Sequence, residues 1–223
     1  MIKANTDIIS FNEIPALSEA AERSVFLVRH SMRESLKNGN LEPGLTPEGH
    51  SYAIECGRKL AGWQNVSYGA SPRRRTMETM RDLIKGAGLP EAEITPCPAI
   101  YDAAMYNSEE DFSSFLEHHD VSAILKLYYS TGNAPGMVDL NEFSAKLITF
   151  LTQPRPGVKN LLLTSHDIVI VALLQTLGVR QFVLDDWCGY VHGAFLTQHS
   201  DGKWQAYYAV PDKENRKKYS LFI

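Results

Sequence analysis

The sequence has few cysteines, no excess of basic residues and no long apolar run, and each shortage excludes a class of protein. Its cysteines, Cys56, Cys97 and Cys188, are odd in number and lie in no metal-ligand spacing, which argues against a disulfide scaffold or a zinc site. The formal net charge of -4 argues against a general binder of nucleic acid or membrane surfaces. No apolar run could cross a bilayer and residues 1–23 lack the pattern of a secretion signal, so we expect a cytoplasmic protein.

Linkers and internal repeats are also missing. No stretch rich in Pro, Gly or Ser divides the chain, so residues 1–223 are expected to form a single domain. Residues 1–23 are interpreted as an N-terminal extension, with an irregular lead-in and a short helix over about 16–22. Residues 101–136 are rich in aromatic side chains and have no strand pattern, which predicts a small helical cap insertion with helices over 109–117 and 121–129. Within it, His118 and His119 are expected to be exposed.

Residues 24–28 predict a strand that ends in a charged cluster. Consecutive apolar residues are typical of a strand that is covered on both faces, as in a parallel sheet. Arg29, His30, Ser31 and Arg33 follow it. In open α/β sheets the ligand site lies at the carboxyl ends of the strands, so a cation and an imidazole at this edge indicate chemistry on an anion.

A second predicted strand, residues 66–70, leads into a helix that begins with arginines. We expect Ser71 to be the N-cap of this helix, which carries Arg73, Arg74 and Arg75 in its first turn. The positive end of the helix dipole disfavours cations, and a bound anion would remove the conflict. Arg73 and Arg74 are predicted to be solvated, whereas Arg75 is predicted to point at the site.

A third predicted strand, residues 160–164, ends in Ser165-His166-Asp167 ahead of an apolar helix over 168–177. A second imidazole and a carboxylate therefore reach the same edge of the sheet. Helices are also predicted from Thr46-Pro47 onward and over 140–151 after an Asp139 N-cap, because Thr and Asp are good caps. Two β-rich runs joined by a turn at 200–203 predict a C-terminal β-hairpin.

Four ordered motifs resemble those of the histidine phosphatase superfamily, which includes the cofactor-dependent phosphoglycerate mutases and the histidine acid phosphatases. The motifs are Arg29-His30-Ser31-Met32-Arg33, Leu45-Thr46-Pro47-Glu48-Gly49, Ser71-Pro72 with Arg75 and Thr79, and Ser165-His166-Asp167. The resemblance spans about residues 24–210 and implies a mutase-like α/β fold: a mostly parallel central sheet flanked by helices, with the helical cap and the C-terminal hairpin. One position departs from the family pattern, since Ser31 stands where a Gly usually follows the nucleophilic histidine.

The expected activity is hydrolysis of a small phosphomonoester, with His30 attacking phosphorus to form a phosphohistidine. His166 would stabilise the phosphoryl charge, and Asp167, with Asp102 as the reserve, would protonate the leaving alkoxide and then activate water. Guanidinium forks suit phosphoryl oxygens, which carry the charge in the transition state. The predicted substrate-binding set is Arg29, Arg33, Arg75, Ser31 and His192. No metal or other cofactor is required.

Two alternatives to the phosphatase remain open at this point. A mutase would use the same phosphohistidine but hold the displaced product and exclude water. A catalytically weak module that binds phosphate or a phosphoprotein is the other, and Ser31 is the feature that favours it. The expected partner of the phosphatase is a small-molecule phosphomonoester rather than nucleic acid or a membrane.

Overall fold

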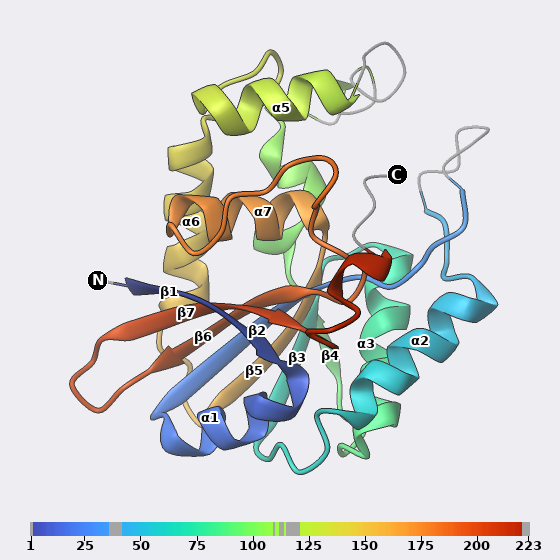
Figure 1. Cartoon of the computed structure of the whole chain (residues 1–223), viewed down its shortest axis with the longest axis vertical. Helices are drawn as coiled ribbons and strands as arrows, with labels where there is room; N and C mark the ends of the chain where they lie inside the picture. The colour runs from blue at the N-terminus through green and yellow to red at the C-terminus, as the bar shows by residue number, and fades with distance from the viewer. Residues whose placement is uncertain (1, 36–41, 109, 112–113, 115–120, 220–223) are drawn as a thin grey trace.

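A seven-stranded sheet forms the centre of the molecule, with the strand order β1-β7-β6-β2-β5-β3-β4 (Figure 1). The computed structural model describes residues 2–35, 42–108, 110–111, 114 and 121–219. Pairs β2–β5, β5–β3, β3–β4 and β1–β7 are parallel, whereas β6 is antiparallel to both β2 and β7. The predicted mostly parallel sheet and the antiparallel C-terminal pair are therefore confirmed. The strands are β1 (Ile2–Ser10), β2 (Arg23–Arg29), β3 (Val66–Ala70), β4 (Ile94–Pro96), β5 (Asn160–Ser165), β6 (Gly193–Gln198) and β7 (Trp204–Val210).

Helices cover both faces of the sheet, which explains why β2 is buried along its length. Side chains of β2 alternate between two cores: Phe26 and Val28 pack with the first set of helices, whereas Val25 and Leu27 pack with the second. The first set comprises α1 (Ile14–Ala20), α2 (Pro47–Arg58) and α3 (Arg74–Ala87). The second comprises α5 (Val121–Thr131), α6 (Leu140–Thr152) and α7 (Asp167–Thr176). Figure 1 shows α5 lying above α7, on the side away from the sheet.

Residues 2–10 differ from the predicted irregular lead-in, because they form the edge strand β1 alongside β7. An edge strand is partly exposed on both faces, and the register of β1 shifts between Ala4 and Ile8. The alternation that would have identified a strand is therefore interrupted. The short helix predicted after the lead-in is present as α1.

Two of the three predicted helix caps are confirmed. The Thr46 hydroxyl accepts a hydrogen bond from the Gly49 N–H at the start of α2, and the Asp139 carboxylate accepts from Asn141 and Glu142 at the start of α6. The cap of α3 is different, since Arg73 occupies the N-cap position without a side-chain bond. Ser71 lies two residues earlier and points into the site described below.

The described part of residues 101–136 contains a short 3₁₀ helix (Asp102–Met105) and α5. Tyr128 of α5 is buried in the second core, and the Tyr129 hydroxyl donates to the Ile168 carbonyl at 2.7 Å. Most of the predicted helix over 109–117, together with His118 and His119, lies outside the described residues, as does much of the loop after Arg33. Within the part of the chain that is described, no helix is both long and apolar enough to span a membrane.

Candidate active site

The carboxyl ends of β2 and β5 bring His30 and His166 together. Arg29 is paired with Ser165 across these neighbouring parallel strands, and each histidine is the next residue along its chain. The two imidazole centroids lie 5.5 Å apart, and both rings are buried. Sheet register therefore sets the separation of the two predicted catalytic histidines.

The His30 ring is held in one tautomer by the backbone of the next residue. Its Nδ1 lies 2.8 Å from the Ser31 carbonyl oxygen, and a carbonyl can only accept, so Nδ1 carries the hydrogen. The lone pair is then on Nε2. Burial, aided by the charges of Arg75, His166 and Arg29, lowers the pKa of His30 well below its ordinary value of 6.5. His30 is consequently a neutral imidazole at pH 7, with a nucleophilic Nε2.

His166 has the opposite tautomer. Its Nδ1 lies 3.3 Å from Nη2 of Arg75, which can only donate, so the hydrogen is on Nε2 and is donated to the Ser71 hydroxyl at 2.8 Å. Burial, followed by the nearby arginines, of which Arg75 has the largest effect, lowers the pKa of His166 well below 6.5. This ring is therefore a neutral hydrogen-bond donor at the edge of the cluster.

Arg29 and Arg75 carry buried N–H groups that donate to none of the residues that the structure describes. Nη1 of Arg29 donates to the Cys188 carbonyl at 2.5 Å, and the guanidinium lies over the Tyr190 ring at 4.2 Å. Among the described residues, Nε of Arg29 and both Nε and Nη1 of Arg75 have no hydrogen-bond partner. An unsatisfied buried donor costs about 1–3 kcal/mol, and more when it is charged. An anion that accepted these bonds would recover that cost.

Both predicted acids lie in this cluster, each paired with an arginine. Asp102 accepts from Arg75 at 2.8 Å and from Arg73 at 3.3 Å, and it lies 3.6 Å from Nδ1 of His166. Asp167 is 3.1 Å from Nη2 of Arg29, and the same oxygen accepts from Nε1 of Trp187 at 3.0 Å. The side chain of Asp167 is 16% exposed and that of Asp102 is 7% exposed, so Asp167 is the more accessible of the two.

The prediction that Arg73 is solvated is wrong. Its side chain is 8% exposed, forms ion pairs with Asp102 and Glu42, and lies over the Tyr101 ring. Glu42 also accepts a hydrogen bond from the backbone N–H of Arg74. Carboxylates therefore offset part of the repulsion between the arginines and the positive end of the helix dipole. Arg74 is solvated as predicted, with a 64% exposed side chain that pairs with Glu78 one turn along α3.

Arg33 and Ser31 lie beside the histidines. Arg33 is half-buried, and burial lowers its pKa against the opposing charges of Tyr190 and Asp167. The Ser31 hydroxyl donates to the Gly49 carbonyl at 2.7 Å, and its N–H donates to the Thr79 hydroxyl. Ser31 does not have a positive φ, so a serine in place of the usual glycine causes no backbone strain here.

The His192 side chain lies apart from the two catalytic candidates. Its Nδ1 is 2.6 Å from the Tyr208 hydroxyl and 3.2 Å from the Gly189 nitrogen, and the ring lines a separate cavity of about 200 Å³ beside α2. Its backbone does reach the cluster, because the His192 carbonyl accepts a hydrogen bond from the backbone N–H of Arg29 at 2.8 Å. The resemblance to the family had placed His192 near the site, whereas the structure directs its ring into this separate cavity.

Sequence reasoning missed four residues of the cluster: Ser71, Arg73, Trp187 and Tyr190. Ser71 had a signal, since it precedes Pro72, but that signal was interpreted as a helix cap. Trp187 and Tyr190 lie in the irregular segment before β6. Nothing local to that segment indicates that its aromatic side chains return to the end of β2.

The buried histidines predict a loss of stability in acid. The pKa values of His30 and His166 lie well below 6.5, and burial lowers that of His192 to about 3. Below pH ~6.5 these histidines are protonated in the unfolded chain but stay neutral in the folded chain. The free energy of unfolding therefore has its full value above pH ~6.5 and decreases as the pH falls below it. The decrease is up to about 1.4 kcal/mol per pH unit for each histidine. Urea denaturation at about pH 7.5 and about pH 5.5 should show the fall. His192→Gln should reduce the slope by about one proton, and an equal slope in both proteins would contradict the prediction.

The comparisons with known proteins agree with this geometry. The profile of the histidine phosphatase superfamily (branch 1) matches residues 25–187, whereas no curated protein matches the chain. A mycobacterial glucosyl-3-phosphoglycerate phosphatase has a TM-score of 0.55 at 15% identity, over 84% of this chain and 99% of that one. The phosphoglycerate mutase of Bacillus anthracis has a TM-score of 0.57 at 15% identity, over 90% and 99%. The protein histidine phosphatase SixA, complexed with tungstate, has a TM-score of 0.50 at 17% identity, over 85% and 97%.

At these identities the solved structures establish the fold, which is that of the phosphoglycerate mutases and histidine phosphatases. The family profile covers most of the chain and includes both histidines at the strand ends. With its mostly parallel sheet and its paired imidazoles at the ends of β2 and β5, the chain belongs to the histidine phosphatase superfamily.

Proposed function

We propose that the protein is a phosphatase that hydrolyses a small phosphomonoester through a phosphohistidine on His30. The observation that supports this most directly is a neutral imidazole with its Nε2 lone pair available, beside two arginines whose buried N–H groups have no partner among the described residues. A nucleophile and anion-binding donors in one place are what phosphoryl transfer requires.

The charges of the cluster suit an anionic ligand. The part of the chain that the structure describes contributes four arginines to the cluster and three carboxylates, so positive charge is in excess even with all three carboxylates ionised: Arg29, Arg33, Arg73 and Arg75 against Asp102, Asp167 and Glu42. Both imidazoles are neutral and do not alter this balance. A phosphomonoester dianion would supply the missing negative charge and acceptors for the arginine N–H groups.

The proposed reaction has two steps. In the first, which starts with Asp167 protonated in the substrate complex, Nε2 of His30 attacks phosphorus, the bond from phosphorus to the ester oxygen breaks, and Asp167 gives its proton to the leaving alkoxide. In the second, Asp167 takes a proton from water, the resulting hydroxide attacks phosphorus, and inorganic phosphate leaves His30. His166 would donate from Nε2 to a phosphoryl oxygen in place of Ser71, with Arg29 and Arg75 holding the other oxygens.

A phosphatase and a mutase differ in the fate of the phosphoryl group, and phosphoglycerates distinguish them. The purified protein should release inorganic phosphate and show no isomer exchange that depends on a bisphosphate primer, because Asp167 is exposed enough for water to reach the site. Phosphate release can be followed colorimetrically and exchange by phosphorus NMR. Exchange faster than release would instead identify a mutase.

Turnover of a panel of phosphorylated metabolites tests the proposal against the binding module. Ser31 was the feature that favoured a module, but its hydroxyl is turned to the Gly49 carbonyl and its backbone is unstrained. We therefore expect turnover of at least one panel member, with His30→Ala as the inactive control. Stabilisation by phosphate without turnover of any substrate would favour the module.

A further inference from the structure

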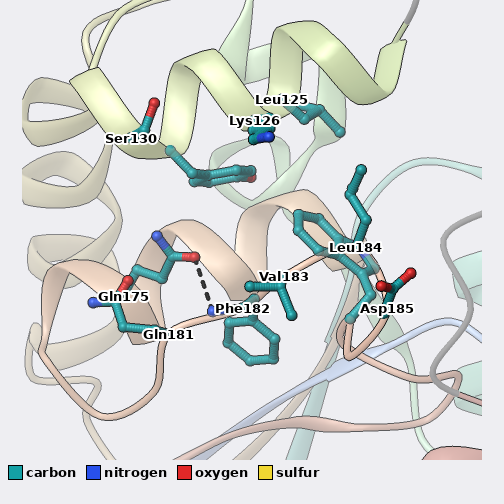
Figure 2. A pocket seen from close by; sticks show the side chains of 11 residues that line it. Leu125, Lys126, Ser130, Gln175, Gln181, Phe182, Val183, Leu184 and Asp185 are labelled. Carbon is teal, nitrogen blue, oxygen red and sulfur yellow. Dashed lines mark hydrogen bonds between the residues drawn. The ribbon is translucent and has the colours of Figure 1, made fainter.

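A cavity of about 470 Å³ lies between α5, the end of α7 and the irregular segment 181–187 (Figure 2). Tyr129, Phe182 and Trp187 form its aromatic walls, and Val183 and Gln175 also line it. The Trp187 ring packs edge-on against the other two, with centroids 5.7 Å and 6.2 Å away. The volume falls in the range of about 300–1,000 Å³ that is usual for small-molecule sites, which are mostly apolar with a few placed polar groups.

One apolar side chain at this cavity, that of Val183, is open to solvent. Val183 lines the cavity and is 62% exposed. Leu127 of α5 is 45% exposed but does not line the cavity. These two are the exposed large hydrophobic residues among those described. Contact with Val183 and the aromatic walls would remove apolar surface from water, which favours a flat apolar ligand by about 25 cal/mol per Å².

The polar lining determines which ligand groups fit and where. The Gln175 side-chain oxygen accepts the Phe182 N–H at 3.2 Å, so its amide nitrogen is left as a donor, and Figure 2 shows that nitrogen turned toward α5. Lys126 adds a positive charge on α5, whereas Asp185 lies at the opposite end of the cavity from Gln175. An acceptor or anionic group would therefore bind at the Gln175 end, and the aromatic part would pack against the exposed surfaces of the rings.

Two of the aromatic walls also hold the first residues of α7. Nε1 of Trp187 donates to the Asp167 carboxylate at 3.0 Å, and the Tyr129 hydroxyl donates to the Ile168 carbonyl at 2.7 Å. Asp167 in turn pairs with Arg29 in the active site. A ligand packed against Trp187 therefore contacts the side chain that fixes the Asp167 carboxylate.

We propose that this cavity binds a planar aromatic molecule that carries a carboxylate or sulfonate, and that its binding is coupled through Trp187 to phosphate binding. The second half rests on the proposed function, because it requires that the Arg29 cluster binds phosphate. Coupling of this kind is reciprocal: if the aromatic ligand changes phosphate affinity, phosphate changes the affinity of the aromatic ligand by the same factor.

The binding half is tested by titration with 8-anilinonaphthalene-1-sulfonate, an aromatic sulfonate made of a planar naphthalene and a phenyl ring, whose fluorescence rises in apolar sites. The whole protein should bind one molecule saturably. Val183→Asp should weaken binding by about tenfold or more, whereas Leu127→Asp, which adds the same charge to an exposed apolar position outside the cavity, should leave it nearly unchanged. Lys126→Glu, which reverses the charge that α5 offers to an anionic ligand, provides a second variant with an expected loss of binding.

Equal losses in Val183→Asp and Leu127→Asp would overturn the site, because the probe would then report general surface hydrophobicity. So would sedimentation that shows a dimer in the wild type and a monomer in Val183→Asp, because the face would then be an interface between copies of the chain.

The coupling half is tested by measuring the affinity for inorganic phosphate with and without saturating probe. We expect a shift of about fivefold or more, within the usual range of allosteric coupling. Trp187→Phe keeps an aromatic wall but loses the N–H to Asp167, so it should bind the probe and abolish the shift. An unchanged phosphate affinity in the wild type overturns the coupling, whereas failure to bind phosphate at all overturns the proposed function and leaves the binding result intact.

Discussion

Replacement of His30 with alanine should lower turnover of an aryl phosphate by roughly four to six orders of magnitude, the usual scale for removal of a covalent nucleophile. The physical reason is that Nε2 of His30 carries the available lone pair, because Nδ1 is committed to the Ser31 carbonyl. Binding of inorganic phosphate should persist, since Arg29 and Arg75 remain. Steady-state kinetics and calorimetric titration with phosphate measure the two effects separately.

His50→Ala is the matched control for that experiment. His50 lies on α2, and its ring is partly exposed and hydrogen-bonded to Asp82, outside the active-site cluster. Its loss should leave turnover close to that of the wild type. If His30→Ala also retained near-wild-type turnover while remaining folded by circular dichroism, the phosphohistidine mechanism would be wrong.

The second large effect concerns the proton donor. Asp167→Asn should slow substrates with poor alkoxide leaving groups by about 10²–10⁴, the usual range for a general acid, and slow activated aryl phosphates far less. Departure of an aryl oxide needs little protonation, so the ratio of the two losses reports the missing acid. Asp167 is preferred because it adjoins His166 and is the more exposed of the two candidates, so it can reach a leaving group on the solvent side.

Asp102→Asn provides the comparison. Asp102 holds Arg73 and Arg75 in place, so its loss should weaken phosphate binding and lower kcat/KM for all substrates by a similar factor. A selective loss in Asp102→Asn, with a uniform one in Asp167→Asn, would move the proton donor to Asp102. A small and uniform loss in Asp167→Asn alone would limit Asp167 to a structural role through its contacts with Arg29, Trp187 and the Ile168 N–H.

The parts of the site that could be predicted are those encoded in continuous sequence. Buried strands β2 and β5 appear as short apolar runs, and the residues that follow them, such as His30 and His166, must reach one edge of a parallel sheet. The edge strand β1 could not be identified in this way, since its exposure and register shift hide the alternation.

Contacts between distant segments account for the errors. Ser71 was expected to cap a helix, but its hydroxyl binds His166, which is 95 residues away. Arg73 was expected in solvent, but Asp102 and Glu42 are 29 and 31 residues away from it. A side chain that can serve a local or a distant partner has the same sequence pattern in both cases, and tertiary packing decides between them.

The pairing of β2 with β5 has a consequence for how this chain can diverge. Arg29 and Ser165 are register partners, so the separation of the two imidazoles is independent of how many residues connect the strands. A slip of one residue within either strand would turn its side chains to the other face and separate the two rings. Insertions and deletions in the loops that connect β2 and β5 leave that register intact, so these loops can change in length while the paired histidines keep their positions.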